Sequence, residues 1–230
     1  MKKIGLIGGL TWESTADYYR IINEMVHERL GKRHSAEMIV GSFDFDPIDR
    51  MMAENNWDGV AELLFGMARN LEKAGAECLL ICCNTLHKIA DRVERPGGAK
   101  LIHLIDAIAD EIILRKMKKV GLIGSIYTMK QDFYRDRLAR QGIEVVIPEE
   151  NDMKIIMKII ETELGIGKIK ENSRKIFVGI INNLMIKGAE GVILGCTEIP
   201  LLIRKQDTPV VLFDSTWLHS AAAVNFALEQ

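Results

Sequence analysis

The sequence of 230 residues repeats itself, and this repetition limits what the chain can fold into more than any other feature. KKIGLIGG at residues 2–9 returns as KKVGLIGS at residues 118–125. GAECLLICC at residues 75–83 returns as GAEGVILGC at residues 188–196. The offsets are 116 residues (from 2 to 118) and 113 residues (from 75 to 188). Two matches in the same order and at nearly the same offset indicate a duplicated domain.

A weaker third match concerns the end of each repeat. LIHLID at residues 101–106 resembles VVLFD at residues 210–214, and Asp106 and Asp214 are offset by 108 residues (from 106 to 214). A helix is expected after each aspartate, and the second of these is the C-terminal helix at 217–228. By symmetry, we expect each helix to cross to the other domain. The predicted domains are residues 1–106 with 215–230 and residues 107–214, with the active site in the cleft between them.

Short apolar runs alternate with helical stretches in both halves. The runs that predict strands lie at residues 3–8, 38–43, 78–82, 120–123, 144–147 and 192–194. The stretches that predict helices lie at residues 14–30, 58–74 and 172–187. Strands that alternate with helices favour parallel sheets joined by right-handed crossovers. The predicted fold class is α/β: two similar parallel-sheet domains related by pseudo-twofold symmetry, with the C-terminal helix returning to the first domain.

Composition argues against several classes of protein. The formal net charge is −2, so electrostatics give no reason to expect nucleic acid or an anionic membrane as a partner. No apolar run approaches the roughly 18 to 20 residues that span a bilayer. No small-residue cleavage site follows the apolar start, so we expect a cytoplasmic location. The four cysteines form no CxxC pair, and a reducing compartment would keep them as thiols.

Two of those cysteines occupy matching positions in the duplication. Cys83 and Cys196 both lie at the carboxyl end of an apolar run, where parallel sheets bind their ligands. A racemase must remove the α-proton from one face of its substrate and return a proton to the other face. Two thiols that face one cleft would supply both groups without either having to move. For Cys78 and Cys82, the strand pattern favours a buried structural role instead.

Polar residues follow both of these candidate acid/base groups. Asn84 and Thr85 come after the first cysteine, and Thr197 and Glu198 come after the second. Asn84, Thr85 and Thr197 can hold the α-carboxylate and ammonium of an amino acid and stabilise charge on the α-carbon. A helix that begins after each strand would lower the thiol pKa from its ordinary value of about 8.5. One cysteine must begin each turnover as a thiolate and the other as a thiol.

Other polar residues near these motifs are candidates for further roles. His87 lies four residues after Cys83, and no HxxxH or CxxC supplies the additional ligands that a metal site would need. We interpret His87 as a cap or a hydrogen-bond partner that orients the Cys83 turn. Glu13 and Glu198 are each open to two roles, as a nearby base or as a partner for the ammonium. The glycines of GLIGG do not make a dinucleotide fingerprint, and neither a metal nor a cofactor is expected.

At these residues the sequence resembles the aspartate/glutamate racemase family. The matching motifs are GLIGGLTWEST (5–15), CNTLHK (83–88) and GCTEI (195–199), and the resemblance extends over essentially the whole chain. It implies a two-domain α/β fold, catalysis without pyridoxal phosphate or metal, and a homodimer. It identifies Cys83 rather than Cys82 as the first acid/base. It further implies that Cys83 serves the D-enantiomer and Cys196 the L-enantiomer.

The resemblance also implies residues that line the substrate site. They follow the first strand of each repeat: Leu10 and Thr11 in the first, Ser125 and Thr128 in the second. The implied substrate is an amino acid, aspartate and/or glutamate. Aspartate-specific relatives place a basic residue on each side of the distal carboxylate. Arg50 matches one of these, and Lys168 is nearest to the other, where no lysine aligns cleanly.

Two alternatives to this function remain open at the level of sequence. Arg50 is equally well interpreted as a solvated surface residue, and Met52 would then help to form a pocket for a neutral side chain. The chain would in that case be a neutral or broad-specificity amino-acid racemase, or another enzyme of the superfamily, such as a decarboxylase, a maleate isomerase or a hydantoin racemase. A single-cysteine decarboxylase should lack one of the two cysteines, and both are present. A small-molecule binding protein would need an export signal or degenerate catalytic residues, and the sequence shows neither.

Overall fold

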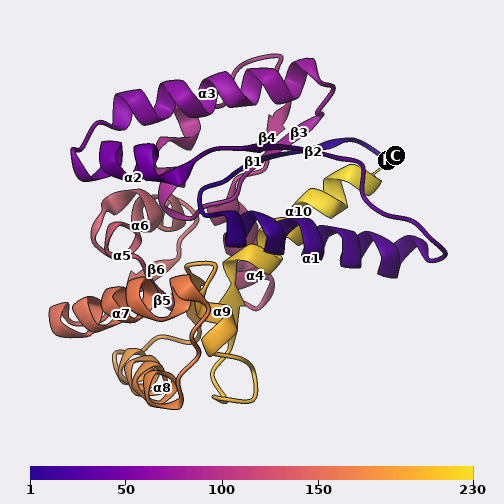
Figure 1. Cartoon of the computed structure of the whole chain (residues 1–230). Helices are drawn as coiled ribbons and strands as arrows, with labels where there is room; N and C mark the ends of the chain where they lie inside the picture. Colours follow the sequence, from indigo (N-terminus) through magenta and orange to yellow (C-terminus); the bar gives the residue numbers. More distant parts are fainter. Residues whose placement is uncertain (230) are drawn as a thin grey trace. The chain divides into compact units, whose positions relative to one another are not determined.

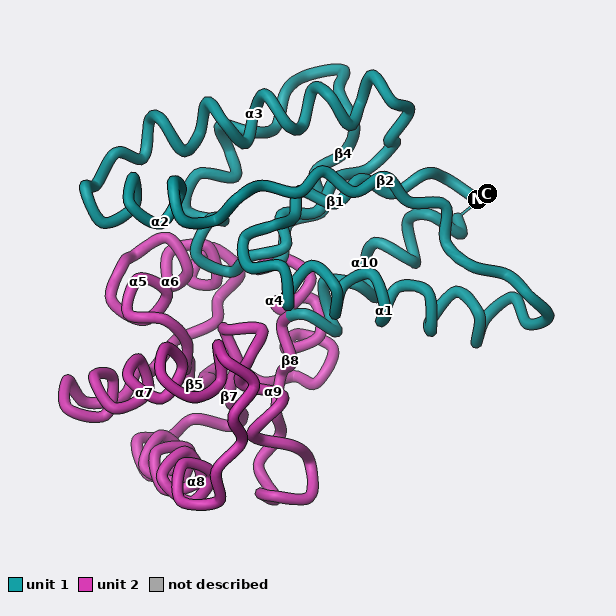
Figure 2. Tube along the Cα trace, in the orientation of Figure 1, with its two compact units in different colours: residues 1–104, 216–230 teal, residues 105–215 magenta. Residues whose placement is uncertain are grey.

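The computed structural model describes residues 1–229 and divides into two compact units. Unit 1 contains Met1–Leu104 and the chain from Thr216 onward, and unit 2 contains Ile105–Ser215 (Figure 2). Each unit is built on its own four-stranded sheet. None of the helices formed by residues 1–229 is both long and apolar enough to cross a membrane.

Unit 1 begins with the first copy of the repeat. Its elements are β1 (Ile4–Gly8), α1 (Trp12–Leu30), β2 (Met38–Ser42), α2 (Phe45–Ala53), α3 (Trp57–Lys73), β3 (Cys78–Ile81), the 3-10 helix η1 (Thr85–Arg92), β4 (Lys100–Leu101) and α10 (Ser215–Leu228), which begins at the unit boundary (Figure 1). Every residue of β1 and β3 is buried, because both strands lie inside the sheet. This burial on both faces explains why the two strands are continuous apolar runs rather than alternating ones.

Unit 2 contains the second copy. Its elements are α4 (Leu104–Leu114), which begins at the unit boundary, β5 (Lys119–Gly124), α5 (Ile126–Lys130), α6 (Asp132–Ala139), β6 (Glu144–Val146), α7 (Glu150–Thr162), the 3-10 helix η2 (Leu164–Ile166), α8 (Glu171–Ile186), β7 (Val192–Gly195), α9 (Ile199–Leu202) and β8 (Leu212–Asp214). The inner strands β5 and β7 are again almost completely buried. The sequence pattern and the burial pattern therefore agree in both copies.

The two sheets have the same strand order. Unit 1 has the order β2-β1-β3-β4, unit 2 has the order β6-β5-β7-β8, and every pair of neighbouring strands is parallel. Ile7 of β1 is in register with Ile81 of β3, and Gly124 of β5 is in register with Gly195 of β7. The predicted α/β class with two similar parallel sheets is confirmed. In each unit, the strand that precedes the candidate cysteine lies beside the first strand of the repeat.

The C-terminal helix α10 packs on unit 1, as the fold prediction required. Ala223, Val224 and Ala227 belong to the same buried cluster as Ile4 and Leu6 of β1. The main-chain N–H of Lys2 donates to the carbonyl of Ala227 at 2.8 Å. Each buried aliphatic carbon of these side chains contributes roughly 0.8 kcal/mol, so the helix is an integral part of this core.

Candidate functional site

The four cysteines fall into two groups by burial. Cys78 and Cys82 are completely buried, whereas Cys83 and Cys196 are half-buried. Burial raises the pKa of the Cys78 thiol to about 12 and also raises that of Cys82, because a thiolate is disfavoured away from water. These two thiols therefore stay protonated near neutral pH, in line with the structural role expected for them. Only Cys83 and Cys196 combine partial exposure with a position just beyond a strand.

Cys83 sits in a tight turn after β3. The strand ends at Ile81, and the main-chain N–H of Cys83 donates to the carbonyl of Ile81 at 2.8 Å. Asn84 and Thr85, which follow, are almost fully buried, and η1 begins at Thr85. The expected helix after the strand is thus a 3-10 helix, whose polar groups are less well aligned than those of an α-helix. Any stabilisation of a Cys83 thiolate then depends on nearby N–H groups rather than on a long helix dipole.

His87 ties this turn to the rest of unit 1. Its Nδ1 lies 2.8 Å from the main-chain oxygen of Cys83, and its Nε2 accepts the main-chain N–H of Leu104 at 3.2 Å. The imidazole is almost completely buried. The expected hydrogen bond between His87 and the Cys83 turn is present, and its role in orienting that turn stays a prediction.

Ser14 and Thr15 also support this end of the sheet, and the sequence did not single them out. The Ser14 hydroxyl donates to the carbonyl of Cys82 at 2.8 Å, and the Thr15 hydroxyl accepts the N–H of Gly9 at 2.8 Å. Both residues lie in the first turn of α1 and are buried. A signal for them exists in the sequence, because small hydroxyl residues directly after a GG turn are well suited to bond the backbone of neighbouring turns.

The turn after β1 contains two of the residues implied to line the substrate site. Thr11 is the N-cap of α1, and its hydroxyl accepts the N–H of Ser14 at 3.4 Å. Leu10 is buried, with 3% of its surface exposed. Because β1 and β3 are adjacent and parallel, the turn after β1 and the Cys83 turn lie at the same edge of the sheet. The structure therefore brings Leu10 and Thr11 to the same edge as Cys83 within unit 1.

Cys196 follows β7 directly and has a different neighbour. Its thiol donates to Oε2 of Glu198 at 2.8 Å, and the Thr197 hydroxyl donates to the same oxygen at 2.9 Å. Glu198 is 9% exposed, so this carboxylate is largely screened from water. The helix α9 that follows has only four residues, which makes it too short for a substantial helix dipole. The Cys196 thiol therefore has a buried carboxylate, rather than the start of a long helix, as a hydrogen-bond partner.

Ser125 and Thr128 take up the equivalent place beside Cys196. Ser125 is the N-cap of α5, and its hydroxyl oxygen accepts the N–H of Thr128 at 3.2 Å. Thr128 is completely buried. They follow β5, which pairs with β7, so unit 2 repeats the arrangement of unit 1: a capping hydroxyl after the first strand of the repeat and a cysteine after its neighbour.

The residues considered for side-chain recognition lie on α2 and directly after η2. Arg50 lies on α2 with its side chain 74% exposed, and its guanidinium bonds Asp46 at 2.5 Å, one turn earlier. Met52, on the same helix, is buried. Lys168 is exposed and follows η2, where its main-chain N–H donates to the carbonyl of Glu163. A role for these residues in substrate recognition stays a prediction.

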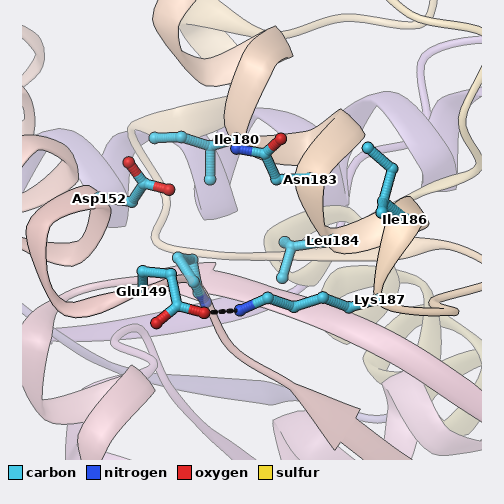
Figure 3. Close-up of a pocket in the computed structure, with 8 residues that line it drawn as sticks. Glu149, Asp152, Ile180, Asn183, Leu184, Ile186 and Lys187 are labelled. Atoms are coloured by element: carbon cyan, nitrogen blue, oxygen red, sulfur yellow. Dashed lines mark hydrogen bonds and ion pairs between the residues drawn. The ribbon is translucent and has the colours of Figure 1, made fainter.

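Two surface hollows, each within a single unit, are lined by residues other than these cysteines. A pocket of about 210 Å³ in unit 2 is lined mainly by residues at the start of α7 and along α8 (Figure 3). An ion pair between Glu149 and Lys187 crosses its wall. A shallower hollow in unit 1 is formed by the segment from Asp91 to Pro96. Neither contains Cys83 or Cys196, and no group of His, Cys, Asp or Glu side chains among residues 1–229 is arranged to hold a metal ion.

Known proteins share both the sequence pattern and the fold. The sequence pattern of the Asp/Glu/Hydantoin racemase family matches residues 7–223. The crystal structure of a candidate Asp/Glu racemase from Yersinia pestis is 45% identical, with a TM-score of 0.94 and complete coverage of both chains. That of an aspartate racemase homologue from Pyrococcus horikoshii is 38% identical, with a TM-score of 0.89 and again complete coverage of both.

A more distant relative is the glutamate racemase of Aquifex aeolicus, which is 28% identical over 144 residues. That alignment covers 60% of this chain and 52% of the relative, so the chain spans about half the length of this glutamate racemase. For the present chain, the family pattern matches most of its length, and the fold and the strand-end cysteines agree with that match. The chain belongs to the Asp/Glu/Hydantoin racemase family.

Proposed function

We propose that the protein racemises an acidic amino acid, aspartate and/or glutamate, without a cofactor, and that Cys83 and Cys196 act on opposite faces of the substrate α-carbon. One observation carries this proposal. Each copy of the repeat has a half-buried thiol just beyond the strand that neighbours its first strand, in two sheets of identical order. Two-base racemisation needs this pair of equivalent groups, one to accept a proton and one to supply a proton.

The proposed reaction moves two protons and changes no oxidation state. One cysteine, as a thiolate, takes the α-proton and becomes a thiol. The electron pair left on the α-carbon is delocalised into the α-carboxylate. The second cysteine, as a thiol, then gives its proton to the opposite face of the α-carbon and becomes a thiolate. Catalysis in the reverse direction starts from this exchanged protonation state.

The hydrogen bond between Cys196 and Glu198 supports an assignment of the starting protonation state. If Glu198 is a carboxylate, its oxygen can only accept in this bond, and the proton then resides on the sulfur. Cys196 is then the acid and Cys83 the base before substrate binds. The family resemblance links Cys83 to the D-enantiomer. In this form, Cys83 therefore removes the α-proton of a D-amino acid, and Cys196 returns a proton to the opposite face to give the L-enantiomer.

Polar groups beside the cysteines complete the proposed site. Asn84, Thr85 and Thr197 supply the amide and hydroxyl groups that the α-carboxylate and ammonium need. Donors directed at the carboxylate also stabilise the charge that it gains when the α-proton leaves. Such stabilisation is required in the absence of a cofactor, because an α-proton next to a carboxylate is otherwise only very weakly acidic.

A neutral amino acid is the second candidate substrate, and a specific observation favours it. The Arg50 side chain is largely exposed and already bonds Asp46 on its own helix. An arginine of that kind gains little by binding a distal carboxylate, because it must first give up this partner. The proposal of aspartate or glutamate as the substrate rests instead on the names of the similar proteins, an aspartate racemase homologue and a glutamate racemase.

The test is exchange of the α-proton in deuterated water, followed by NMR for each enantiomer of aspartate, glutamate, alanine and serine. We expect exchange and chiral inversion for an acidic amino acid. The variants Cys83→Ser and Cys196→Ser should each reduce racemisation about 100- to 10,000-fold, the range that general acid–base groups contribute. Cys82→Ser is the matched control, because this buried neighbour should be dispensable. Full activity in both of the first two variants would end the two-base proposal.

A further inference from the structure

The hydrogen bonds of His87 fix its tautomer. The main-chain N–H of Leu104 can only donate, so Nε2, which accepts it at 3.2 Å, carries no proton. The proton therefore resides on Nδ1, which donates to the carbonyl oxygen of Cys83 at 2.8 Å. The ring is neutral in this arrangement, and both of its nitrogen atoms have partners.

Neighbouring rings hold this imidazole in place. His87 packs edge-on against His103, with ring centroids 4.8 Å apart, and against His219 at 5.4 Å. His219 is itself fixed, because its Nε2 donates to the carbonyl of Ile102 at 2.7 Å and its Nδ1 accepts the hydroxyl of Tyr18 at 2.8 Å. Burial lowers the pKa of His219 to about 3, so this neighbour brings no positive charge near neutral pH.

The bond to the Cys83 carbonyl determines how one peptide unit is turned. In a trans peptide the C=O of one residue and the N–H of the next point in opposite directions, and residues 1–229 contain no cis bond. With its C=O directed at His87, the peptide between Cys83 and Asn84 must direct the Asn84 N–H to the opposite side. The same plane limits the backbone angles of Cys83 and hence the direction of its side chain.

The second copy of the repeat shows that the fold does not require a histidine here. Pro200 stands four residues after Cys196, where the first copy has His87 four residues after Cys83. Glu198 likewise stands two residues after Cys196, where the first copy has Thr85. The duplicated scaffold thus forms a turn after both strands, but it supports the two cysteines differently. One is held through its main-chain carbonyl, and the other through its thiol.

We infer that His87 is a positioning residue for Cys83. As the neutral Nδ1–H tautomer, His87 fixes the peptide between residues 83 and 84, and with it the directions of the Cys83 sulfur and of the Asn84 N–H. This inference rests on the proposed function only for what Cys83 does. Without the imidazole the peptide can rotate, and the thiolate loses its alignment with the α-proton. Such misplacement lowers the rate of proton transfer much more than it lowers affinity for substrate.

Alkylation of Cys83 by iodoacetamide, followed by peptide mass spectrometry across pH, tests the inference without any need for racemase activity. In His87→Phe we expect the midpoint of Cys83 alkylation to move to higher pH, because N–H groups that favour the thiolate lose their orientation. Alkylation of Cys196 in the same molecule is the internal reference and should not change. We further expect kcat to fall about 10- to 100-fold with little change in KM.

Two variants separate positioning from general stability. His87→Asn keeps a donor near the place of Nδ1, so it should recover most of the lost kcat and the original alkylation midpoint. His219→Phe is the matched control, because it removes an equally buried imidazole and its two hydrogen bonds, none of them to the Cys83 turn, but keeps an aromatic ring beside His87. It should leave Cys83 alkylation unchanged. The inference is overturned if Cys83 alkylation is unchanged in His87→Phe, or if His87→Asn does not recover it. If the wild-type protein shows no α-proton exchange, only the proposed function is contradicted.

Discussion

The two cysteines have matching places but different immediate partners. The Cys196 thiol donates a hydrogen bond to Glu198, whereas the carbonyl of Cys83 accepts a hydrogen bond from His87. A neighbouring carboxylate disfavours a thiolate, both by like charge and by bonding the protonated form. Under the proposed mechanism, this difference would make Cys196 the acid and Cys83 the base at the start of a cycle, although the underlying scaffold is duplicated.

Replacing Glu198 by glutamine tests this explanation. Glu198→Gln removes the negative charge, so the thiolate fraction of Cys196 should rise and iodoacetamide should label it faster at pH 7. Labelling of Cys83 provides the comparison within the same sample and should stay constant. Racemisation should decrease, because the resting enzyme then lacks a protonated acid. Slower or equal labelling of Cys196 would show that Glu198 does not retain the proton.

His219 makes the stability of unit 1 dependent on pH. Its pKa is about 3 in the folded chain and near 6.5 when exposed, so between these values the unfolded chain binds one more proton. The free energy of unfolding should therefore fall as the pH is lowered from 6.5 towards 3, by up to about 1.4 kcal/mol per pH unit. Urea unfolding at pH 7, 6 and 5 measures this slope.

The variant His219→Phe supplies the comparison for that measurement. It should be less stable at pH 7, because the Tyr18 hydroxyl and the Ile102 carbonyl each lose a buried partner at a cost of about 1 to 3 kcal/mol. Its slope between pH 7 and 5 should be shallower than that of the wild type. Equal slopes would mean that other groups cause the pH dependence.

Among the elements, the long and strongly patterned ones were predictable from sequence. The strands at 4–8, 38–42 and 78–81 differ from the predicted runs by one residue at most at either end. Burial accounts for β1 and β3, because inner parallel strands must be apolar throughout, and glycine marks the end of β1. The inner strands β5 and β7 of the second copy were predicted in the same way.

Short elements and buried polar contacts were not predictable in this way. β4 has two residues, and α5 and α9 have five and four, which is too few to show a hydrophobic period. The chain around Cys83 was recognised from its repeat, but the contact of Ser14 with Cys82 and that of His219 with Tyr18 join distant segments. A hydroxyl residue after the glycine turn indicates that Ser14 can bond the backbone, but sequence spacing does not show which distant group it contacts. That choice depends on how α1 and α10 pack on the sheet.

The turn that joins β1 to α1 depends on a glycine that tolerates no side chain. Gly9 has a φ of 71°, and a Cβ there would lie 2.2 Å from the carbonyl oxygen of Phe43. Gly9→Ala should therefore add the left-handed backbone strain of about 1 to 2 kcal/mol to an overpacking cost of about 1 to 3 kcal/mol. The shift of the urea unfolding midpoint relative to the wild type measures the sum.

Gly167 offers a matched control for that substitution. Its φ is 70°, close to that of Gly9, but nothing lies within 4 Å of the position that its Cβ would take. Gly167→Ala should therefore be destabilised by the backbone strain alone, about 1 to 2 kcal/mol. If the two variants are equally stable, the close approach of Phe43 does not matter, and the turn after β1 can relax.

For the whole molecule, the proposed mechanism requires that a cysteine from each unit contact the same bound substrate. Cys83 belongs to unit 1 and Cys196 to unit 2, at positions 113 residues apart along the chain (from 83 to 196). If both cysteines act on a single α-carbon, one bound substrate must shield both sulfurs from a thiol reagent. Mechanisms in which only one cysteine contacts the substrate predict protection of that cysteine alone.

Substrate protection of alkylation distinguishes these cases. The amino acid identified by α-proton exchange is added at increasing concentration, and the labelling rates of Cys83 and Cys196 are followed by peptide mass spectrometry. We expect both rates to fall with the same half-protection concentration, because one binding event covers both thiols. The completely buried Cys78 reports on unfolding and should remain unlabelled throughout. Protection of a single cysteine, or two different half-protection concentrations, would contradict a shared site and with it the two-base mechanism.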